Sequence, residues 1–227
     1  MSRKSDCMPS MTHRMRSLKM LNLQLCDRFD CERGMWPYVR PSYAIPEKMV
    51  RFKVSESYDG RDKFCHFHIE DYQFERLWER PESYIDILRR YAGLIAPDFS
   101  TYTDMPTPMQ MWNVYRSRAL THYWQSQGLE VIPLIQFSDE SSYDWAFEGL
   151  PKHSVLATSS VGVYRNKTCR RDFARGMEAA CKVLEPTDLV WFGLEVDCDT
   201  NGARVHRYNN DNDERLRAAH KRKLEAL

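Results

Sequence analysis

The stretch at residues 93–137, GLIAPDFSTYTDMPTPMQMWNVYRSRALTHYWQSQGLEVIPLIQF, predicts a strand, a polar loop, a long helix and a second strand. Its first apolar run stops at Pro97, and apolar residues at helical spacing follow from Met109 to the terminating Gly128. The almost wholly apolar run 131–137 is typical of a strand covered on both faces. Since a long crossover helix joins the two strands, we expect them to be parallel.

Strand and helix patterns keep alternating downstream of this unit. We predict strands at 94–97, 131–137, 154–159 and 189–196, with helices at 109–127 and 169–185. Upstream, alternation predicts strands at 50–54 and 64–69, joined by a hairpin or short loop. The fold class is therefore α/β: a mostly parallel sheet or partial (βα) barrel with flanking helices, an irregular N-terminal region and charged tails.

Composition sets the domain organisation. The 227 residues are 42% hydrophobic, enough for one sizeable core. We expect a flexible basic leader at 1–19, a single α/β domain at 20–196 and a charged tail at 197–227.

Several protein classes are excluded by what the sequence lacks. A net charge of +1 disfavours a surface built wholly for nucleic acid, and no apolar run approaches the roughly 20 residues that span a bilayer. The seven cysteines are odd in number and without CxxC spacing, so we expect reduced thiols in the cytoplasm. Walker, GxSxG, HExxH and Rossmann motifs are absent.

Polar residues follow three of the expected strands, and the carboxyl ends of parallel strands meet at one rim, where α/β folds bind ligands. Carboxylates there can move protons or hold a divalent metal, and an arginine suits an anionic group. We predict catalytic roles for Asp98, Asp104 and Asp139, and ligand-binding roles for Tyr102, Asn113, Arg116, Ser159 and Gly162.

Each of these residues also has a structural interpretation. Asp104 could cap the following helix, Asp98 could hold its own loop, and Arg116 could pair with an acid. The functional interpretation depends on their convergence in one cleft.

Two histidines share one face of the strand at 64–69. His66 and His68, two residues apart, could bind one metal ion, as in nicking endonucleases of replication initiators, if a third ligand joined them. The simpler expectation is a solvent-facing or edge-strand pair.

The string APDFSTYTDMPTPMQMWNVYRSR, together with DYQFERLWERPESY and GLPKHSVLATSSVG, resembles a family of unknown function common in bacteriophages and mobile elements. The resemblance spans about residues 64–193. It implies a phage or mobile-element setting and brings no established activity or catalytic residues.

Two functional hypotheses follow. The chain is an enzyme acting on a nucleotide or another phosphorylated or anionic ligand at the loop rim, with a divalent metal as an open option. Alternatively, it is a non-catalytic interaction protein that engages a host or phage protein.

Overall fold

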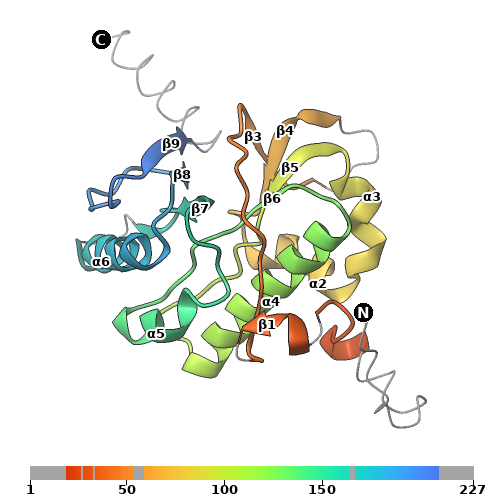
Figure 1. Ribbon diagram of the computed structural model, residues 1–227, viewed down its shortest axis with the longest axis horizontal. Helices are drawn as coiled ribbons and strands as arrows, with labels where there is room; N and C mark the ends of the chain where they lie inside the picture. Colours follow the sequence, from red (N-terminus) through yellow and green to blue (C-terminus); the bar gives the residue numbers. More distant parts are fainter. Residues whose placement is uncertain (1–18, 27, 33, 54–58, 164–166, 210–227) are drawn as a thin grey trace, which may run out of the picture.

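Parallel strands dominate the architecture (Figure 1). The computed structural model describes residues 19–26, 28–32, 34–53, 59–163 and 167–209, so most of the leader, Cys7 and the end of the tail lie outside the described residues. A four-stranded parallel sheet contains β3 (Met49–Arg51), β4 (Gly60–His66), β5 (Tyr91–Ile95) and β6 (Val131–Ile132). A three-stranded parallel sheet contains β7 (Val155–Ser159), β8 (Asp188–Phe192) and β9 (Arg204–Tyr208).

Each strand pairs with its neighbour in sequence, and the two sheets continue into one another. A parallel bridge between Leu134 and Ala157 joins the segment after β6 to β7. The ends of this curled sheet also approach each other, because the Tyr208 hydroxyl of β9 donates to the Pro46 carbonyl just before β3. The Phe192 ring of β8 lies 4.2 Å from the His66 ring of β4. The structure therefore confirms the predicted α/β class, with the curl of a partial (βα) barrel.

The helices cover the outside of the curl. They are α2 (Arg76–Glu79), α3 (Ile85–Leu88), α4 (Thr107–Ser126), α5 (Tyr143–Ala146) and α6 (Lys167–Leu184), with short 3-10 turns η1 (Arg28–Asp30), η2 (Asp71–Gln73), η3 (Pro81–Tyr84) and η4 (Glu140–Ser142). A small antiparallel hairpin, β1 (Cys31–Glu32) and β2 (Trp36–Pro37), contacts α4. No helix in the described ranges is long and apolar enough to cross a membrane.

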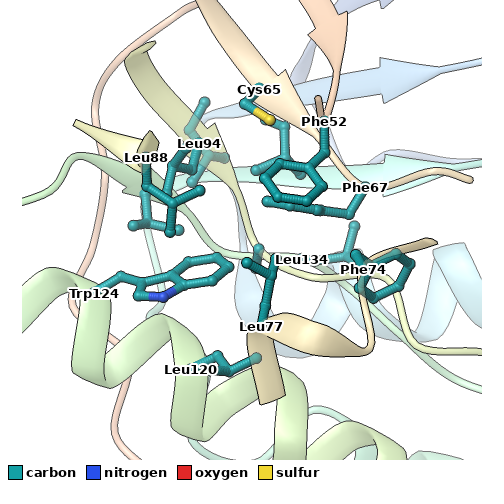
Figure 2. Packing of buried hydrophobic residues seen from close by; sticks show 14 of the residues in the cluster. Phe52, Cys65, Phe67, Phe74, Leu77, Leu88, Leu94, Leu120, Trp124 and Leu134 are labelled. Atoms are coloured by element: carbon teal, nitrogen blue, oxygen red, sulfur yellow. The ribbon is translucent and has the colours of Figure 1, made fainter. Parts of the chain in front are cut away.

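Two apolar clusters hold these layers together. In the first, Leu120 and Trp124 of α4 face Leu94 of β5 and Phe67, which follows β4, with Leu77 of α2 between them (Figure 2). Each of these side chains is fully buried, which stabilises the fold by about 1.5–3 kcal/mol per residue. In the second cluster, α6 covers β7 and β8 through Met177, Ala180, Cys181, Leu184, Leu156, Leu189 and Trp191.

The strands predicted at 94–97 and 131–137 are parallel, as expected: Leu94 pairs with Val131 and Ile95 with Ile132. The predicted hairpin between the upstream strands is wrong, because β3 and β4 are also parallel. β6 is shorter than the predicted 131–137, since Pro133 has no N–H to continue the ladder.

β9 was not predicted. It lies within the segment 197–227 that the sequence interpretation assigned to a charged tail, and it pairs in parallel with β8 along its whole length. Its residues lack an apolar alternation because Arg204 and His206 both bind the Asp188 carboxylate of β8. Polar pairing therefore replaces the hydrophobic signal by which a strand is normally recognised.

Gly176 of α6 allows a test of the close packing between α6 and the segment that follows β6. A Cβ at this position would lie 2.1 Å from the Phe137 ring, which follows β6. Gly→Ala usually stabilises a helix by about 1 kcal/mol, but here we expect Gly176→Ala to destabilise the protein by about 1–3 kcal/mol through overpacking. Urea unfolding of G176A, F137L and the double variant measures this, and a G176A protein that is more stable than wild type would contradict it.

Candidate functional site

Two buried histidines lie at the carboxyl end of β4: His66 is the last residue of the strand, and His68 follows two residues later. The strand lies between β3 and β5, and the strand predicted at 64–69 ends at His66. His66 and His68 are each 6% exposed. The expectation of a solvent-facing or edge pair is therefore wrong, because β4 has a neighbour on each side and its inward face is covered.

His68 is paired with Asp98, which follows β5. Its Nδ1 lies 2.7 Å from Asp98 Oδ2, and the side chains are 1% and 29% exposed respectively. An ionised carboxylate only accepts hydrogen bonds, so the proton of a neutral His68 ring lies on Nδ1. His68 Nε2 then presents a lone pair, and this atom is buried without a hydrogen-bond partner among the described residues.

His66 has the complementary arrangement. Its Nδ1 accepts a hydrogen bond of 3.3 Å from the His68 backbone N–H, so the ring proton lies on Nε2. Burial lowers the pKa of His66 to about 2, and the charges of His68 and Arg51 act in the same direction. The imidazole is therefore neutral at physiological pH and can donate through Nε2, while the neighbouring His68 offers an acceptor.

An aromatic ring from across the curl covers both histidines. Phe192, the last residue of β8, has its ring centroid 4.2 Å from that of His66 and 4.9 Å from that of His68. The two imidazoles also stack on each other, with centroids 5.3 Å apart. This arrangement lowers the water content around the imidazoles and strengthens any polar contact they make.

The loops after β5 and β6 are tied together beside this pair. Gln136 is 5% exposed, and its Nε2 donates to the Phe99 carbonyl at 2.9 Å. Thr101 Oγ1 donates to the Phe137 carbonyl at 2.9 Å. Gln136 Oε1 has no hydrogen-bond partner among the described residues, although it is buried. Two buried acceptors, His68 Nε2 after β4 and Gln136 Oε1 after β6, thus have no hydrogen-bond partner among the described residues, and β5 lies between these two strands.

Arg51 ends β3 and supplies positive charge at the same end of the sheet. Its side chain is exposed, and no hydrogen bond or ion pair links the guanidinium to the residues that the structure describes. Its charge contributes to lowering the His66 pKa, so the two groups lie close enough to interact. An anion bound between them would gain from both the guanidinium and the His66 N–H.

Arg116 has the structural role that the sequence left open. Its NH1 donates to Glu75 Oε1 at 2.5 Å and its NH2 to Asn113 Oδ1 at 2.7 Å. The guanidinium carbon lies 3.9 Å from the centroid of the Phe99 ring. Asn113 in turn donates to the Ser100 carbonyl at 2.6 Å. These two predicted ligand-binding residues therefore support the loop after β5 from α4.

Asp71, which the sequence analysis did not single out, anchors the same loop. Its two carboxylate oxygens accept from the Ser100 backbone N–H at 3.0 Å and the Ser100 hydroxyl at 2.9 Å. Burial raises the Asp71 pKa, the bonds from Ser100 oppose this, and the Asp98 charge raises it further. Asp71 and Asp98 are therefore close enough to interact, on opposite flanks of one loop.

The other predicted carboxylates do not join Asp98 through any hydrogen bond among the described residues. Asp139 caps η4, accepting from the Ser141 backbone N–H at 3.0 Å and the Ser141 hydroxyl at 2.6 Å. Asp104 is exposed and does not cap α4, whose N-cap is Pro106. Tyr102 is 53% exposed on the same loop.

The loop after β7 holds the last two predicted residues. Ser159 Oγ accepts from the Val161 backbone N–H at 3.3 Å. Gly162 is exposed, with a φ of +83° and no atom within 4 Å of where a Cβ would stand. The buried Ser160 between them accepts from Trp191 Nε1 at 3.3 Å and so links this loop to β8.

No group of three or more His, Cys, Asp and Glu side chains suited to a metal ion occurs in the described part of the chain. The nicking-endonuclease interpretation requires a third ligand beside His66 and His68, and it gains no support from these contacts. The arrangement is better suited to proton transfer, because His68 has an orienting carboxylate on one nitrogen and an unpaired lone pair on the other.

Comparisons with known proteins place the chain in a family. The Gene 1 protein of Mycobacterium phage L5 is 34% identical over 166 residues, which cover 72% of this chain and 72% of that protein. The Gene 1 protein of Mycobacterium phage D29 is 36% identical over 166 residues, covering 72% of this chain and 62% of that protein. No solved structure matches. A model of the domain of unknown function DUF4417 matches residues 33–209, so the chain belongs to the DUF4417 family.

Proposed function

We propose that this phage-type protein is an enzyme that acts on a nucleotide or another phosphorylated or anionic ligand at the carboxyl end of its curled parallel sheet. The observation that carries the proposal is the His68–Asp98 pair, 2.7 Å apart, with the second ring nitrogen of His68 buried and unpartnered. In this proposal His68 is the general base and Asp98 orients it.

The chemistry of the pair supports this assignment. A carboxylate bound to one imidazole nitrogen fixes the tautomer and raises the basicity of the other nitrogen. A positioned general base contributes typically about 10²–10⁴ to a reaction rate. When His68 Nε2 takes up a proton, the Asp98 carboxylate, 2.7 Å from Nδ1, stabilises the imidazolium that forms.

The charge around the histidines favours an anionic ligand. Arg51 and the His66 N–H lie on the same end of the sheet as His68, and His66 stays neutral, so it does not compete for a proton. Further along the rim, Ser159 and Gly162 offer a hydroxyl and an open backbone after β7. We include Tyr102, Asp104 and Asp139 as rim residues of this proposal, and we place the activity in the cytoplasm.

The test begins with ligand binding. Nucleoside mono-, di- and triphosphates are screened by thermal shift with and without Mg²⁺, and hits are measured by calorimetry and by turnover. We expect Arg51→Gln to weaken the affinity by roughly tenfold, the loss of about one charge-assisted contact. His68→Gln and Asp98→Asn should lower turnover by about 10²–10⁴ with a smaller change in Kd.

The matched control is His153→Gln, which removes an exposed histidine with a 66% accessible side chain. Equal effects of H153Q and H68Q on turnover would contradict the proposal. So would the absence of any stabilising nucleotide, or unfolding of H68Q and D98N, since a structural pair is needed for folding and not for turnover.

A further inference from the structure

Two thiols lie next to each other at the start of the described chain. Cys26 Sγ and Cys31 Sγ are 3.5 Å apart, and neither forms a disulfide in this structure. Cys26 is buried at 8% exposure, whereas Cys31, the first residue of β1, is half-buried. Covalently bonded sulfurs are about 2.05 Å apart, so a small movement of either side chain brings the atoms into bonding range.

Both sides of the pair are fixed to the body of the protein. On the Cys26 side, Leu25 is 4% exposed in the main apolar cluster, and the Asn22 amide donates to the Trp78 carbonyl. These contacts attach the segment before Cys26 to α2. The first thiol is therefore held in place by packing that does not involve the second.

The Cys31 side is attached to other parts of the fold. The Asp30 carbonyl accepts from the Tyr38 backbone N–H at 2.9 Å, and Glu32 Oε2 accepts from the Gly149 backbone N–H at 2.6 Å. Cys31 itself pairs with Pro37 in the β1–β2 hairpin. Cys26 Sγ also lies 3.9 Å from the Asp30 carbonyl, so contacts on both sides hold the two thiols together, and they react at a high effective concentration, as in other oriented intramolecular reactions.

We propose that Cys26 and Cys31 are a redox-active pair that forms an intramolecular disulfide by exchange with a low-molecular-weight disulfide. The half-buried Cys31 thiolate attacks the small disulfide RSSR, which gives a Cys31–SR mixed disulfide and releases RS⁻. The Cys26 thiolate then attacks the Cys31 sulfur, forms the Cys26–Cys31 bond and releases the second RS⁻. The protein loses two electrons and two protons, and RSSR is reduced to two RSH.

This assignment goes beyond the proposed activity, because the pair lies at the β1–β2 hairpin and shares no residue with the His68–Asp98 pair. The proposal also differs from the expectation of scattered, reduced thiols, since the fold holds the sulfurs of this CX4C pair 3.5 Å apart. A disulfide here links the segment that precedes the hairpin to the hairpin itself. The two thiols therefore form a site at which oxidising conditions produce a disulfide.

The experiment uses the full chain equilibrated with mixtures of reduced and oxidised glutathione. Thiols are then blocked with an alkylating agent, and the tryptic peptides that contain Cys26 and Cys31 are mapped by mass spectrometry. We expect a Cys26–Cys31 disulfide to accumulate at a glutathione ratio at least roughly tenfold more reducing than the one that modifies the exposed Cys169.

Two comparisons make the result specific. In Cys26→Ser, Cys31 should stop at the glutathione mixed disulfide, and in urea the preference over Cys169 should become smaller, because only the short loop between the two cysteines then keeps them close. A mixed disulfide at Cys31 that persists in the wild-type protein would overturn the proposal. Alkylation of both thiols under conditions that modify Cys169 would also overturn it.

Discussion

Replacing Arg118 by methionine should lower the free energy of unfolding by about 3 kcal/mol, because two carbonyls lose their donors inside the protein. Arg118 lies on α4 and is 2% exposed. Its NH2 donates to the Ala146 carbonyl at 2.5 Å, and its NH1 donates to the Glu148 carbonyl. Methionine fills a similar volume without donating, so the buried Ala146 carbonyl at the end of α5 loses the Arg118 donor, and the Glu148 carbonyl loses it as well.

Urea unfolding measures this change, and the melting temperature should fall by about 6–12 °C for a protein of this size. Arg171→Met is the matched control, since Arg171 is 61% exposed and forms a surface pair with Asp172. We expect the control to change stability by less than about 1 kcal/mol. Equal stabilities of the two variants would mean that α5 is not held by Arg118.

Stability should also fall in mild acid because of His66. The pKa of this imidazole is about 2 in the folded protein, chiefly through burial, against its ordinary value of 6.5. Below pH 6.5 the unfolded chain takes up a proton that the folded chain does not, so acid favours unfolding. The expected contribution is a loss of about 2 kcal/mol between pH 7.5 and pH 5.

His66→Phe isolates this contribution, because it keeps a ring against Phe192 and removes the titrating group. The slope of unfolding free energy against pH, measured by urea titration at several pH values, should be smaller in H66F by that amount. If H66F keeps the wild-type slope, His66 takes up a proton in the folded protein as readily as in the unfolded chain.

The parts of the fold that could be predicted are those with strong local patterns. Helix α4 and strands β5 and β7 could be predicted from the spacing of apolar residues. Pro97 marks the end of the β5 pattern and Gly128 the end of the α4 pattern. The parallel pairing of β3 and β4 could not be predicted, since two short alternating runs near each other in sequence also suit a hairpin. β9 carries only a weak apolar signal, because Arg204 and His206 bind Asp188 and only Val205 and Tyr208 pack against the apolar clusters.

The candidate site was predictable only in part, for a similar reason. Asp98 could be singled out as a candidate because it follows an expected strand. His68 could be singled out because it alternates with His66. Their contact depends on β4 and β5 being adjacent, and their burial depends on Phe192, which a distant strand supplies. The ion pair of Arg116 with Glu75 could not be predicted, because no local sequence pattern indicates that Glu75 lies beside α4.

The order of the strands has a consequence for how the protein is made. Within each parallel sheet every strand pairs with the next strand in the chain, and one bridge joins the segment after β6 to β7, so the sheets can grow stepwise as the polypeptide leaves the ribosome. The contacts that close the curl, from Phe192 to His66 and from Tyr208 to Pro46, form only when the last strands arrive. A nascent chain therefore carries His68 and Asp98 before Phe192 has been made, and the His68 ring is covered only after β8 has been added.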